Sequence, residues 1–505
     1  MSPLKEITSR GRRDDAQRPW PRFVVAPDAW RLAGSRLAEG RVSLLGLWGD
    51  DDAVHMALLQ DEPVDVAVIT VDCVEGGFPS IGALHPPAIR LERALQDLYG
   101  FKADGLPDSR PWLDHGRWDL QHPLGERATA SSAPPPYRFL PVEGEGLHQI
   151  PVGPVHAGII EPGHFRFAVN GETVVRLEQK LGYVHKGIDG LMIGTEIDHA
   201  ARLAGRVSGD STVAYALAFA HAVEAALDIK IPPRAAWLRA LMAELERVAN
   251  HLGDFGAICN DASFSMMLAQ CGMLRERTLR ASDAAFGHRL MMDRVVPGGV
   301  AADLGTDGAK QVSTLLSDIR RLFPKLTELY DSTASLQDRT VTTGLLKPEL
   351  ARQFAAGGFV GRASGRAFDA RRAFACSPYQ ELKFDVPVRK EGDVDARVWI
   401  RIHEIEQSLA LIEQILAGLP AGLVRNPLAS GMSDTREGIG FTESFRGDIL
   451  AWVRIDLDGR VVRAHLRDPS WFQWPLLEAA VENNIVADFP LCNKSFNCSY
   501  SGHDV

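Results

Sequence analysis

The sequence has no apolar run long enough to cross a membrane and no sign of an export signal. A membrane-spanning helix needs about 20 consecutive apolar residues, and the most apolar stretch, residues 213–229, is interrupted by Glu224 and Asp228. Asp14 and Asp15 stand where an export signal would place its apolar region. These absences predict a chain that stays in the cytoplasm and reaches a membrane only through partner proteins.

Cysteine is scarce, and the few cysteines form no Cys-x-x-Cys pair. The six are scattered along the chain at Cys73, Cys259, Cys271, Cys376, Cys492 and Cys498. This spacing predicts neither a zinc site nor a disulfide framework. We expect free and mostly buried thiols, as in a reducing compartment.

Basic residues are outnumbered by acidic ones. There are 55 Lys and Arg against 65 Asp and Glu, which gives a formal net charge of −10. A nucleic-acid partner would require a basic face, so this class of partner is excluded. The apolar share of 45% is normal for a globular core, and 505 residues exceed the usual length of one domain. We therefore expect a globular protein of two or three domains.

Residues 1–126 predict a small α/β domain. Residues 64–71 are rich in β-branched side chains, as in a strand, and residues 87–99 have helical apolar spacing that ends at Gly100. A segment rich in Pro, Ser and Ala follows, which suits a linker better than a core. We place this linker at 127–147 and a second domain at 148–505.

The second domain is predicted to be mainly helical with short β-hairpins, so the fold class of the chain is α+β. Asn170-Gly171 separates two strand-like runs, 164–169 and 173–177, and this pair favours a type I′ turn. Helical spacing marks three long segments, at 233–252, 309–332 and 398–419. Shorter strand-like pieces are found at 385–388 and 450–457.

Four residues form a candidate polar stripe if 206–224 is helical. Ser208, Ser211, Tyr215 and Phe219 then fall on one face. Two hydroxyls, a phenol and an aromatic ring could border a polar pocket. Spacing alone favours a plainer interpretation, which is a helix start with capping serines and two core aromatics.

Two further groups of polar residues are weaker candidates. Glu244, Arg247 and His251 share one helix face, and such spacing is typical of an ion pair on a solvated surface. His156 and His164 lie beside glycines in a loop before the hairpin, where histidine more often has a functional role.

Several motifs resemble those of one known family. In the second domain they are Gly153–His156, Glu161–Arg166, Gly182–Ile188, Glu244–Leu252, Arg362–Gly365 and Phe384–Val388. Over nearly all of 148–505 the chain resembles the large subunit of energy-converting nickel–iron hydrogenases, including that of formate hydrogenlyase, and the quinone-site subunit of respiratory complex I. Through Leu91–Gly100 and His122–Leu124, the first domain resembles the smaller complex I partner that is often fused in front.

The sequence departs from the hydrogenases at the metal ligands. Hydrogenases of this family hold their metals with two Cys-x-x-Cys pairs, but the first pair reads Ser208 and Ser211 here, and the second reads Ser499 and Gly502. A shift by one residue aligns Cys498 but leaves Ser501 as its mate. Nickel and low-valent iron require soft thiolates, and a serine hydroxyl cannot replace them. We therefore expect no metal ligands in this chain.

The resemblance also implies a set of site residues. Complex I lacks the cysteines as well and binds the quinone headgroup in the corresponding cavity. Its site histidine corresponds to His164, its site tyrosine to Phe219, and the acid of the hydrogenase proton path to Glu161. Tyr215, one turn earlier, can supply the phenol that Phe219 lacks. The expected catalytic residues are Glu161, His164 and Tyr215, and the expected acceptor-binding residues are His164, Ser208, Asp210, Ser211, Tyr215, Phe219 and Ser499.

The resemblance implies an oxidoreductase subunit in the catalytic arm of a membrane-bound, complex I-like or hydrogenase-related complex. An iron–sulfur small subunit and membrane antiporter-like subunits would be its partners, on the inner face of the cell membrane. Three hypotheses follow: a metal-free cavity that binds a quinone or another small acceptor, a non-catalytic conformational coupler, and a working hydrogenase. The third needs thiolates that the sequence lacks.

Overall fold

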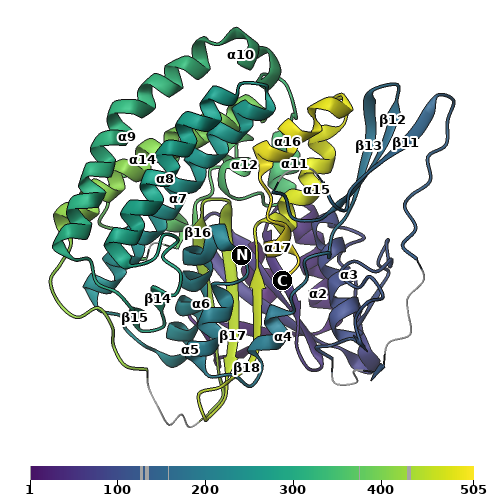
Figure 1. The fold of residues 1–505 in the computed structure, drawn as a ribbon. Coiled ribbons are helices and arrows are strands. Elements are labelled where there is room, and N and C mark those ends of the chain that lie inside the picture. Colours follow the sequence, from purple (N-terminus) through teal and green to yellow (C-terminus); the bar gives the residue numbers. More distant parts are fainter. Residues whose placement is uncertain (1, 126–128, 131–135, 157–158, 375, 429–433) are drawn as a thin grey trace.

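The first part of the chain folds around a five-stranded sheet with strand order β1-β3-β6-β5-β4 (Figure 1). The fold is known from a computed structural model that describes all residues except 1, 126–128, 131–135, 157–158, 375 and 429–433. The strands are β1 (Gly11–Asp14), β3 (Arg22–Val25), β4 (Ser43–Gly49), β5 (Ala53–Gln60) and β6 (Asp65–Asp72). The helices of this part are α1 (Pro3–Thr8), α2 (Pro27–Ala38) and α3 (Ile89–Tyr99).

The predicted strand and helix of this part are confirmed. β6 covers the β-branched run, and six of its residues are buried in the sheet. α3 ends at Gly100, whose φ of +76° is left-handed, as expected for a helix C-terminus. Two short strand pairs complete this part, β7 (Gly77–Pro79) with β8 (Lys102–Asp104) and β9 (Leu120–Gln121) with β10 (Thr129–Ala130).

The second part opens with a three-stranded antiparallel sheet, in which the predicted turn type is wrong. The strands are β11 (Leu147–Val152), β12 (His164–Asn170) and β13 (Thr173–Lys180). Because Asn170 pairs with Thr173, the turn residues are Gly171 and Glu172, and only Gly171 has positive φ (+59°). A left-handed residue at the first central position alone is the pattern of a type II′ turn.

The long helices α7 (Pro233–Asp261), α8 (Ser265–Phe286), α9 (Thr306–Ser332) and α14 (Val394–Gly418) form a bundle beside the sheets (Figure 1). The helix α6 (Thr212–Leu227) lies on the sheet of β16 (Arg436–Ser444) and β17 (Gly447–Ile455). The bundle confirms the three predicted long helices. The shorter ones are α4 (Ile188–Met192), α5 (Ile197–Ala204), α10 (Ala334–Thr340), α11 (Pro348–Gln353), α12 (Gly358–Ala363), α13 (Ala370–Ala373), α15 (Ser470–Val481), α16 (Phe489–Phe496) and α17 (Tyr500–His503). The mixed content confirms the α+β class.

One predicted strand is wrong, and the helix on which the polar stripe depends starts only at Thr212. Residues 385–388 form no strand, because the nearby backbone N–H groups of Lys383 and Asp385 donate to Gln414 and Gln407 of α14 instead of to a neighbouring strand. Residues 206–211 are not α-helical either. α6 begins at Thr212, where the Glu246 carboxylate accepts the first free N–H groups of the helix.

A four-stranded sheet joins the two parts of the chain. Its order is β18-β17-β16-β2, with β16 (Arg436–Ser444), β17 (Gly447–Ile455), β18 (Val461–Arg467) and β2 (Gln17–Arg18). β2 comes from the first part and pairs in parallel with β16. Apolar side chains of β4 and β5 also pack on β16 and β17, with the rings of Trp48 and Trp452 5.8 Å apart.

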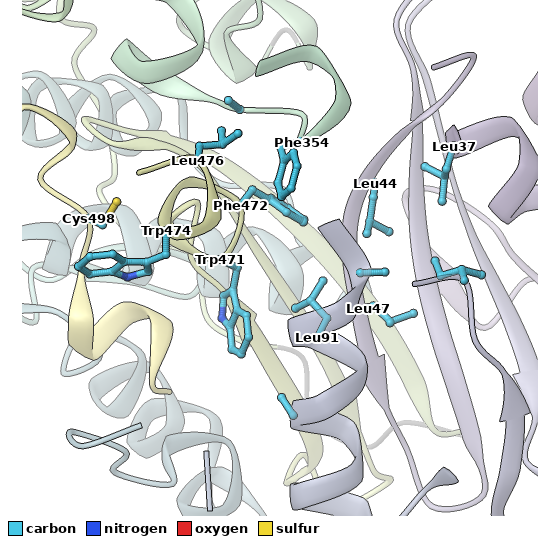
Figure 2. Close-up of a cluster of buried hydrophobic side chains, with 14 of the residues drawn as sticks. Leu37, Leu44, Leu47, Leu91, Phe354, Trp471, Phe472, Trp474, Leu476 and Cys498 are labelled. Atoms are coloured by element: carbon cyan, nitrogen blue, oxygen red, sulfur yellow. The ribbon is translucent and has the colours of Figure 1, made fainter. Parts of the chain in front are cut away.

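A second shared core lies under the C-terminal helices. Figure 2 shows Leu44, Leu47 and Leu91 of the first part facing Trp471 and Phe472 of α15. Cys498 belongs to the same buried cluster. Of the six free cysteines, five are buried, as expected, and Cys376 is exposed. Among the described helices, none is long and apolar enough to span a bilayer.

The boundary at 127–147 stays a prediction, and part of it lies outside the described residues. Limited proteolysis should cut first between Arg127 and Arg138, because such linkers bury little backbone. The two fragments should then remain together on size exclusion, since they share β2–β16 pairing and two apolar cores. Early cleavage within α7, or fragments that separate without denaturant, would contradict this division.

Candidate functional site

Two segments far apart in the sequence meet at a pair of serines. Ser208 lies in extended backbone just before α6, and Ser499 caps the N-terminus of α17. Their hydroxyl oxygens are 3.2 Å apart, and both side chains are buried. Ser499 is fixed on its other side, because its Oγ accepts the N–H of Gly502 at 2.8 Å and its own N–H donates to Ser470. The segments at which hydrogenases carry their two cysteine pairs are therefore adjacent.

Asp210 and Arg446 provide the charges of this site. Arg446 donates to both carboxylate oxygens of Asp210, at 2.9 and 2.6 Å, and to the Ser211 hydroxyl at 3.2 Å. The hydroxyls of Ser208 and Ser211 donate to the same carboxylate, at 2.7 and 3.3 Å. Burial favours the protonated acid, but the Arg446 charge outweighs it and lowers the pKa of Asp210 to about 2. Asp210 is therefore ionised at neutral pH.

Arg446 was not among the residues predicted from the sequence. It lies in the turn between β16 and β17. In the sequence, an arginine next to Gly447 is typical of an exposed surface turn. The structure buries its side chain to 4% exposure, and its Nε donates to the carbonyl of Asn497. Arg446 thereby connects the segment before α6 with the segment before α17.

Tyr215 reaches the same region through Asp468. Its hydroxyl donates to Asp468 Oδ2 at 2.6 Å, and both residues are buried. Burial and the Asp468 charge hold the pKa of Tyr215 well above its usual range, so the phenol keeps its proton. Asp468 also limits position 502, because a Cβ added to Gly502 would lie 2.5 Å from Asp468 Oδ2 and 2.9 Å from Ser499 Oγ. A cysteine at 502 would not fit without rearrangement.

The remaining predicted residues lie at different distances from this group. Glu161 is exposed, but its carboxylate accepts the N–H of Ser501 at 3.0 Å, next to the site. His164 is the first residue of β12 and is buried at 8% exposure. Its Nδ1 lies 3.3 Å from the Gly153 carbonyl, and its Nε2 is buried without a partner among the described residues. Phe219 is buried in an apolar core of α5, α6 and β17.

The structure thus brings Ser208, Asp210, Ser211 and Ser499 into one contact group, while Glu161 bonds to Ser501 and Tyr215 to Asp468, outside the group. No hydrogen bond or ion pair among the described residues joins His164 or Phe219 to them. Their roles, like those of the group as a whole, stay predictions.

Comparisons with known proteins agree with one another. Residues 261–440 match the family "Respiratory-chain NADH dehydrogenase, 49 Kd subunit", and residues 24–133 match "Respiratory-chain NADH dehydrogenase, 30 Kd subunit". Formate hydrogenlyase subunit 5 of Escherichia coli (strain K12) is 31% identical over 448 residues, which cover 86% of this chain and 78% of the relative. An NADH-quinone oxidoreductase subunit of Roseiflexus sp. (strain RS-1) is 32% identical over 352 residues, covering 67% of this chain and 94% of the relative.

The chain belongs to the family of complex I 49 Kd subunits and related hydrogenase large subunits. Among solved structures, a chain of the membrane-bound sulfane sulfur reductase (MBS), an archaeal respiratory membrane complex, superposes with a TM-score of 0.68 at 25% identity. The match covers 72% of this chain and 100% of that chain. The resemblance seen in the sequence is confirmed, including the fused 30 Kd-type part in front. Members of this family are oxidoreductase subunits.

The site does not fit the nickel–iron centre of the hydrogenase members. Its donors are hydroxyls and carboxylates, which are hard ligands, and the Arg446 guanidinium already neutralises Asp210. Cys498, the residue before Ser499, is buried, and burial raises the pKa of its thiol, so it is not a thiolate. Among the residues that the structure describes, no group of three or more His, Cys, Asp or Glu is placed to hold a metal ion.

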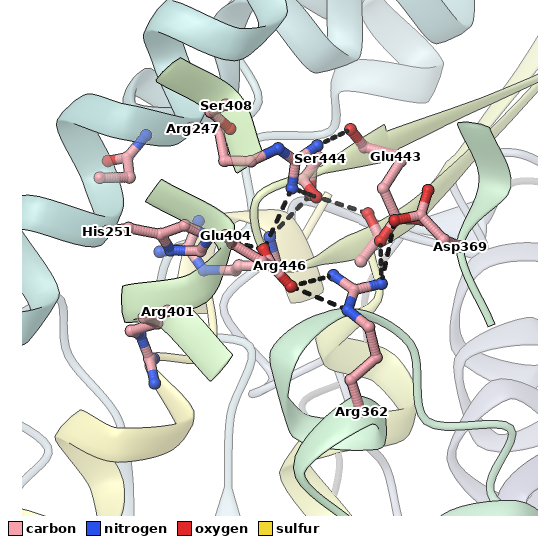
Figure 3. Close-up of polar contacts among 12 residues, drawn as sticks. Arg247, His251, Arg362, Asp369, Arg401, Glu404, Ser408, Glu443, Ser444 and Arg446 are labelled. Carbon is pink, nitrogen blue, oxygen red and sulfur yellow. Dashed lines mark hydrogen bonds and ion pairs between the residues drawn. The ribbon is translucent and has the colours of Figure 1, made fainter. Parts of the chain in front are cut away.

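Beside this site, the family's central helix α7 carries a buried ionic network (Figure 3). The predicted solvated face is wrong, because Glu244, Arg247 and His251 are 0%, 1% and 0% exposed. The cause is long-range packing, which brings Arg371 of α13, Glu404 of α14 and backbone carbonyls of β16 onto α7. His251 Nε2 lies 2.7 Å from Glu404 Oε2, and Arg247 donates to the backbone carbonyls of residues 443 and 444.

Proposed function

We propose that this chain is a catalytic-arm subunit of a membrane-bound, complex I-like oxidoreductase whose former metal site binds a quinone or another small acceptor. The contact between Ser208 and Ser499 carries the proposal. It supports the view that the site geometry persists while its ligands have become oxygen groups. An iron–sulfur small subunit would deliver electrons, and membrane antiporter-like subunits would hold the assembly at the inner face of the cell membrane. The relatives named formate hydrogenlyase, NADH-quinone oxidoreductase and respiratory membrane complex support such partners.

The polar groups of the site suit a ligand that gains electrons and protons together. A bound quinone would supply an acceptor of two electrons and two protons. His164 would face it with a neutral imidazole, since burial lowers the pKa of this histidine. With Nδ1–H donated to the Gly153 carbonyl, Nε2 carries the free lone pair and can accept a proton. The hydroxyls of Ser208 and Ser499 and the phenol of Tyr215 would orient the ligand.

One observation favours a second function, that of a conformational coupler without a substrate. The groups of the site already satisfy one another: Arg446 pairs with Asp210, and Tyr215 pairs with Asp468. A crevice next to Asp210 has a volume of about 20 Å³, which holds one water molecule rather than a ring. In this alternative the subunit transmits movement to the membrane partners through its buried network.

Replacement of His164 by Ala separates the two functions. In the purified native complex, H164A should lower quinone content. It should also lower quinone-dependent turnover about a hundredfold or more, the size expected for one positioned acid–base group. Assembly should be unchanged. The matched control is H148A, which removes an exposed histidine of β11 in the same sheet. If H164A alters only thermal stability, the coupler replaces the acceptor site.

A further inference from the structure

A cavity of about 410 Å³ lies between α6, α7, β16 and the segment that precedes β3. Its walls are aromatic and small apolar side chains. Trp20, Phe374 and Phe441 contact one another at centroid distances of 4.8–5.3 Å. At about 30 Å³ per molecule in the liquid, the volume accommodates roughly 14 waters. The cavity is lined on one side by Arg371, Tyr379 and Glu443, which belong to the buried ionic network.

Glu443 lies on the boundary between this cavity and the network. It is 3% exposed and lines the cavity near the end of β16. Its Oε1 accepts one N–H of Arg362 at 2.8 Å, and its Oε2 accepts the N–H of Ala370 at 2.9 Å. Figure 3 shows Arg362 between Glu443, Asp369 and Glu404, so one guanidinium faces three carboxylates.

Glu443 is the least compensated carboxylate of the three. Arg371 binds both oxygens of Asp369, at 3.0 and 2.7 Å. Glu404 lies 2.7 and 2.8 Å from two nitrogens of Arg362, and it also faces His251. Glu443 accepts only one hydrogen bond from Arg362, because two other nitrogens of this side chain face Glu404. Burial, together with the Asp369 charge, therefore raises the pKa of Glu443 above the ordinary carboxyl range.

Besides the titratable His221 of α6, which lines the same cavity, the charged groups near Glu443 come from five other elements. They are Glu244 and Arg247 from α7, Arg362 from α12, Asp369 and Arg371 at α13, Glu404 from α14 and Asp448 from β17. Arginine keeps its proton throughout the physiological range, and the other carboxylates have closer cationic or hydroxyl partners. Among the network residues named here, Glu443 is therefore the one best placed to change protonation.

Glu443 is also close to the candidate site. Arg446 lies three positions further along the chain, so their Cα atoms are at most about 11 Å apart. Two charges roughly 10 to 15 Å apart in a protein interact strongly enough to move a pKa by about one. A negative charge added at the Asp210–Arg446 pair would thus be felt at Glu443, and water in the cavity can supply the compensating proton.

We infer that Glu443 is a proton-uptake group, which binds one proton from cavity water for each negative charge that reaches the neighbouring site. This inference rests on the proposed function, in which a partner's iron–sulfur cluster delivers the electrons. Each electron that arrives adds one negative charge, and one proton bound to a Glu443 oxygen balances it. The proton reaches the cavity water from bulk solvent as hydronium, so one O–H bond of hydronium breaks as the O–H bond of Glu443 forms. A second proton can bind only after Glu443 has released the first.

Infrared titration of the full chain tests this directly. Between pH 5 and 9 we expect a protonated-carboxyl C=O band that is lost in E443Q. D210N removes one negative charge from the site and should lower the pKa of Glu443 by about one. The matched control is D210N/R446M, which removes one charge of each sign and should leave this pKa near the wild-type value. Ala240→Leu, which fills the cavity, should slow deuterium exchange of the band severalfold.

Three results would overturn the inference: no band that depends on Glu443, a band that D210N does not shift, or exchange that A240L does not slow. The A240L measurement keeps the test valid if D210N fails to fold. Failure here is distinct from failure of the proposed function. If H164A lowers quinone content but no band of Glu443 titrates, the acceptor site stands and the proton-uptake group fails. Conversely, if D210N shifts the Glu443 band while H164A leaves quinone content and turnover of the complex unchanged, the proton-uptake group stands and the acceptor site fails.

Discussion

Replacement of Arg362 by Met should destabilise the protein by roughly 4 kcal/mol, the loss expected when one partner of a buried ion pair is removed. Arg362 is 0% exposed and is the cation between Glu404, Glu443 and Asp369. Met has a similar length and fills much of the same volume, so the effect reports charge rather than a cavity. Without the guanidinium, the carboxylates repel one another in a region from which water is largely excluded. Denaturant unfolding followed by tryptophan fluorescence measures the change.

The control for Arg362 is a surface arginine with an equally short ion pair. Arg320 donates to Glu413 at 2.6 Å, but the two side chains are 44% and 46% exposed. R320M should therefore cost less than about 1 kcal/mol. If R362M and R320M unfold at the same denaturant concentration, the network contributes no more than surface charges do.

Arg446 and Asp210 should show strong energetic coupling. R446M leaves the Asp210 carboxylate with hydroxyl partners only, and D210N leaves a guanidinium that is 4% exposed without its counter-ion. Each single change should cost about 3 kcal/mol. The double variant removes both charges and should cost less than the sum, with a coupling energy of about 2 kcal/mol.

The single and double variants of Arg446 and Asp210 also test whether this pair holds the two segments of the site together. Arg446 also donates to the Asn497 carbonyl, so its loss should loosen the contact between Ser208 and Ser499. R446K keeps the charge but cannot reproduce the two parallel bonds to Asp210, and it should recover only part of the stability. Additive single effects would mean that the pair does not hold the two segments together.

The proximity of the serines was predictable from motif information, while their role in a site stays a prediction. Ser208, Ser211 and Ser499 were found because they stand at ligand positions of a recognisable family pattern, and the structure places them together. Helical spacing did not give this result, since residues 206–211 are not α-helical. Arg446 was missed because a turn arginine has no sequence signal that distinguishes a buried role from an exposed one.

Other misses share one physical cause, which is that burial depends on distant partners. The spacing of Glu244, Arg247 and His251 describes a helix face correctly, but what covers that face comes from residues 127 to 197 positions later. Residues 385–388 have strand-like composition without a strand to pair with. At residues 170–173, the strand register rather than the Asn-Gly pair determined the turn. Gly100, by contrast, ended its helix as predicted, because a left-handed C-terminus is a local property.

In the function proposed above, oxygen groups stand where the hydrogenases have metal ligands, and they bind an acceptor instead. The most direct measurement is metal and quinone analysis of the native complex, purified with its partners. We expect iron from the partner clusters, no stoichiometric nickel, and bound quinone that is diminished in H164A. The serines at 208, 211 and 499, and the lack of space for a side chain at Gly502, are the reasons. One nickel per chain, together with hydrogen uptake by the complex, would contradict the account.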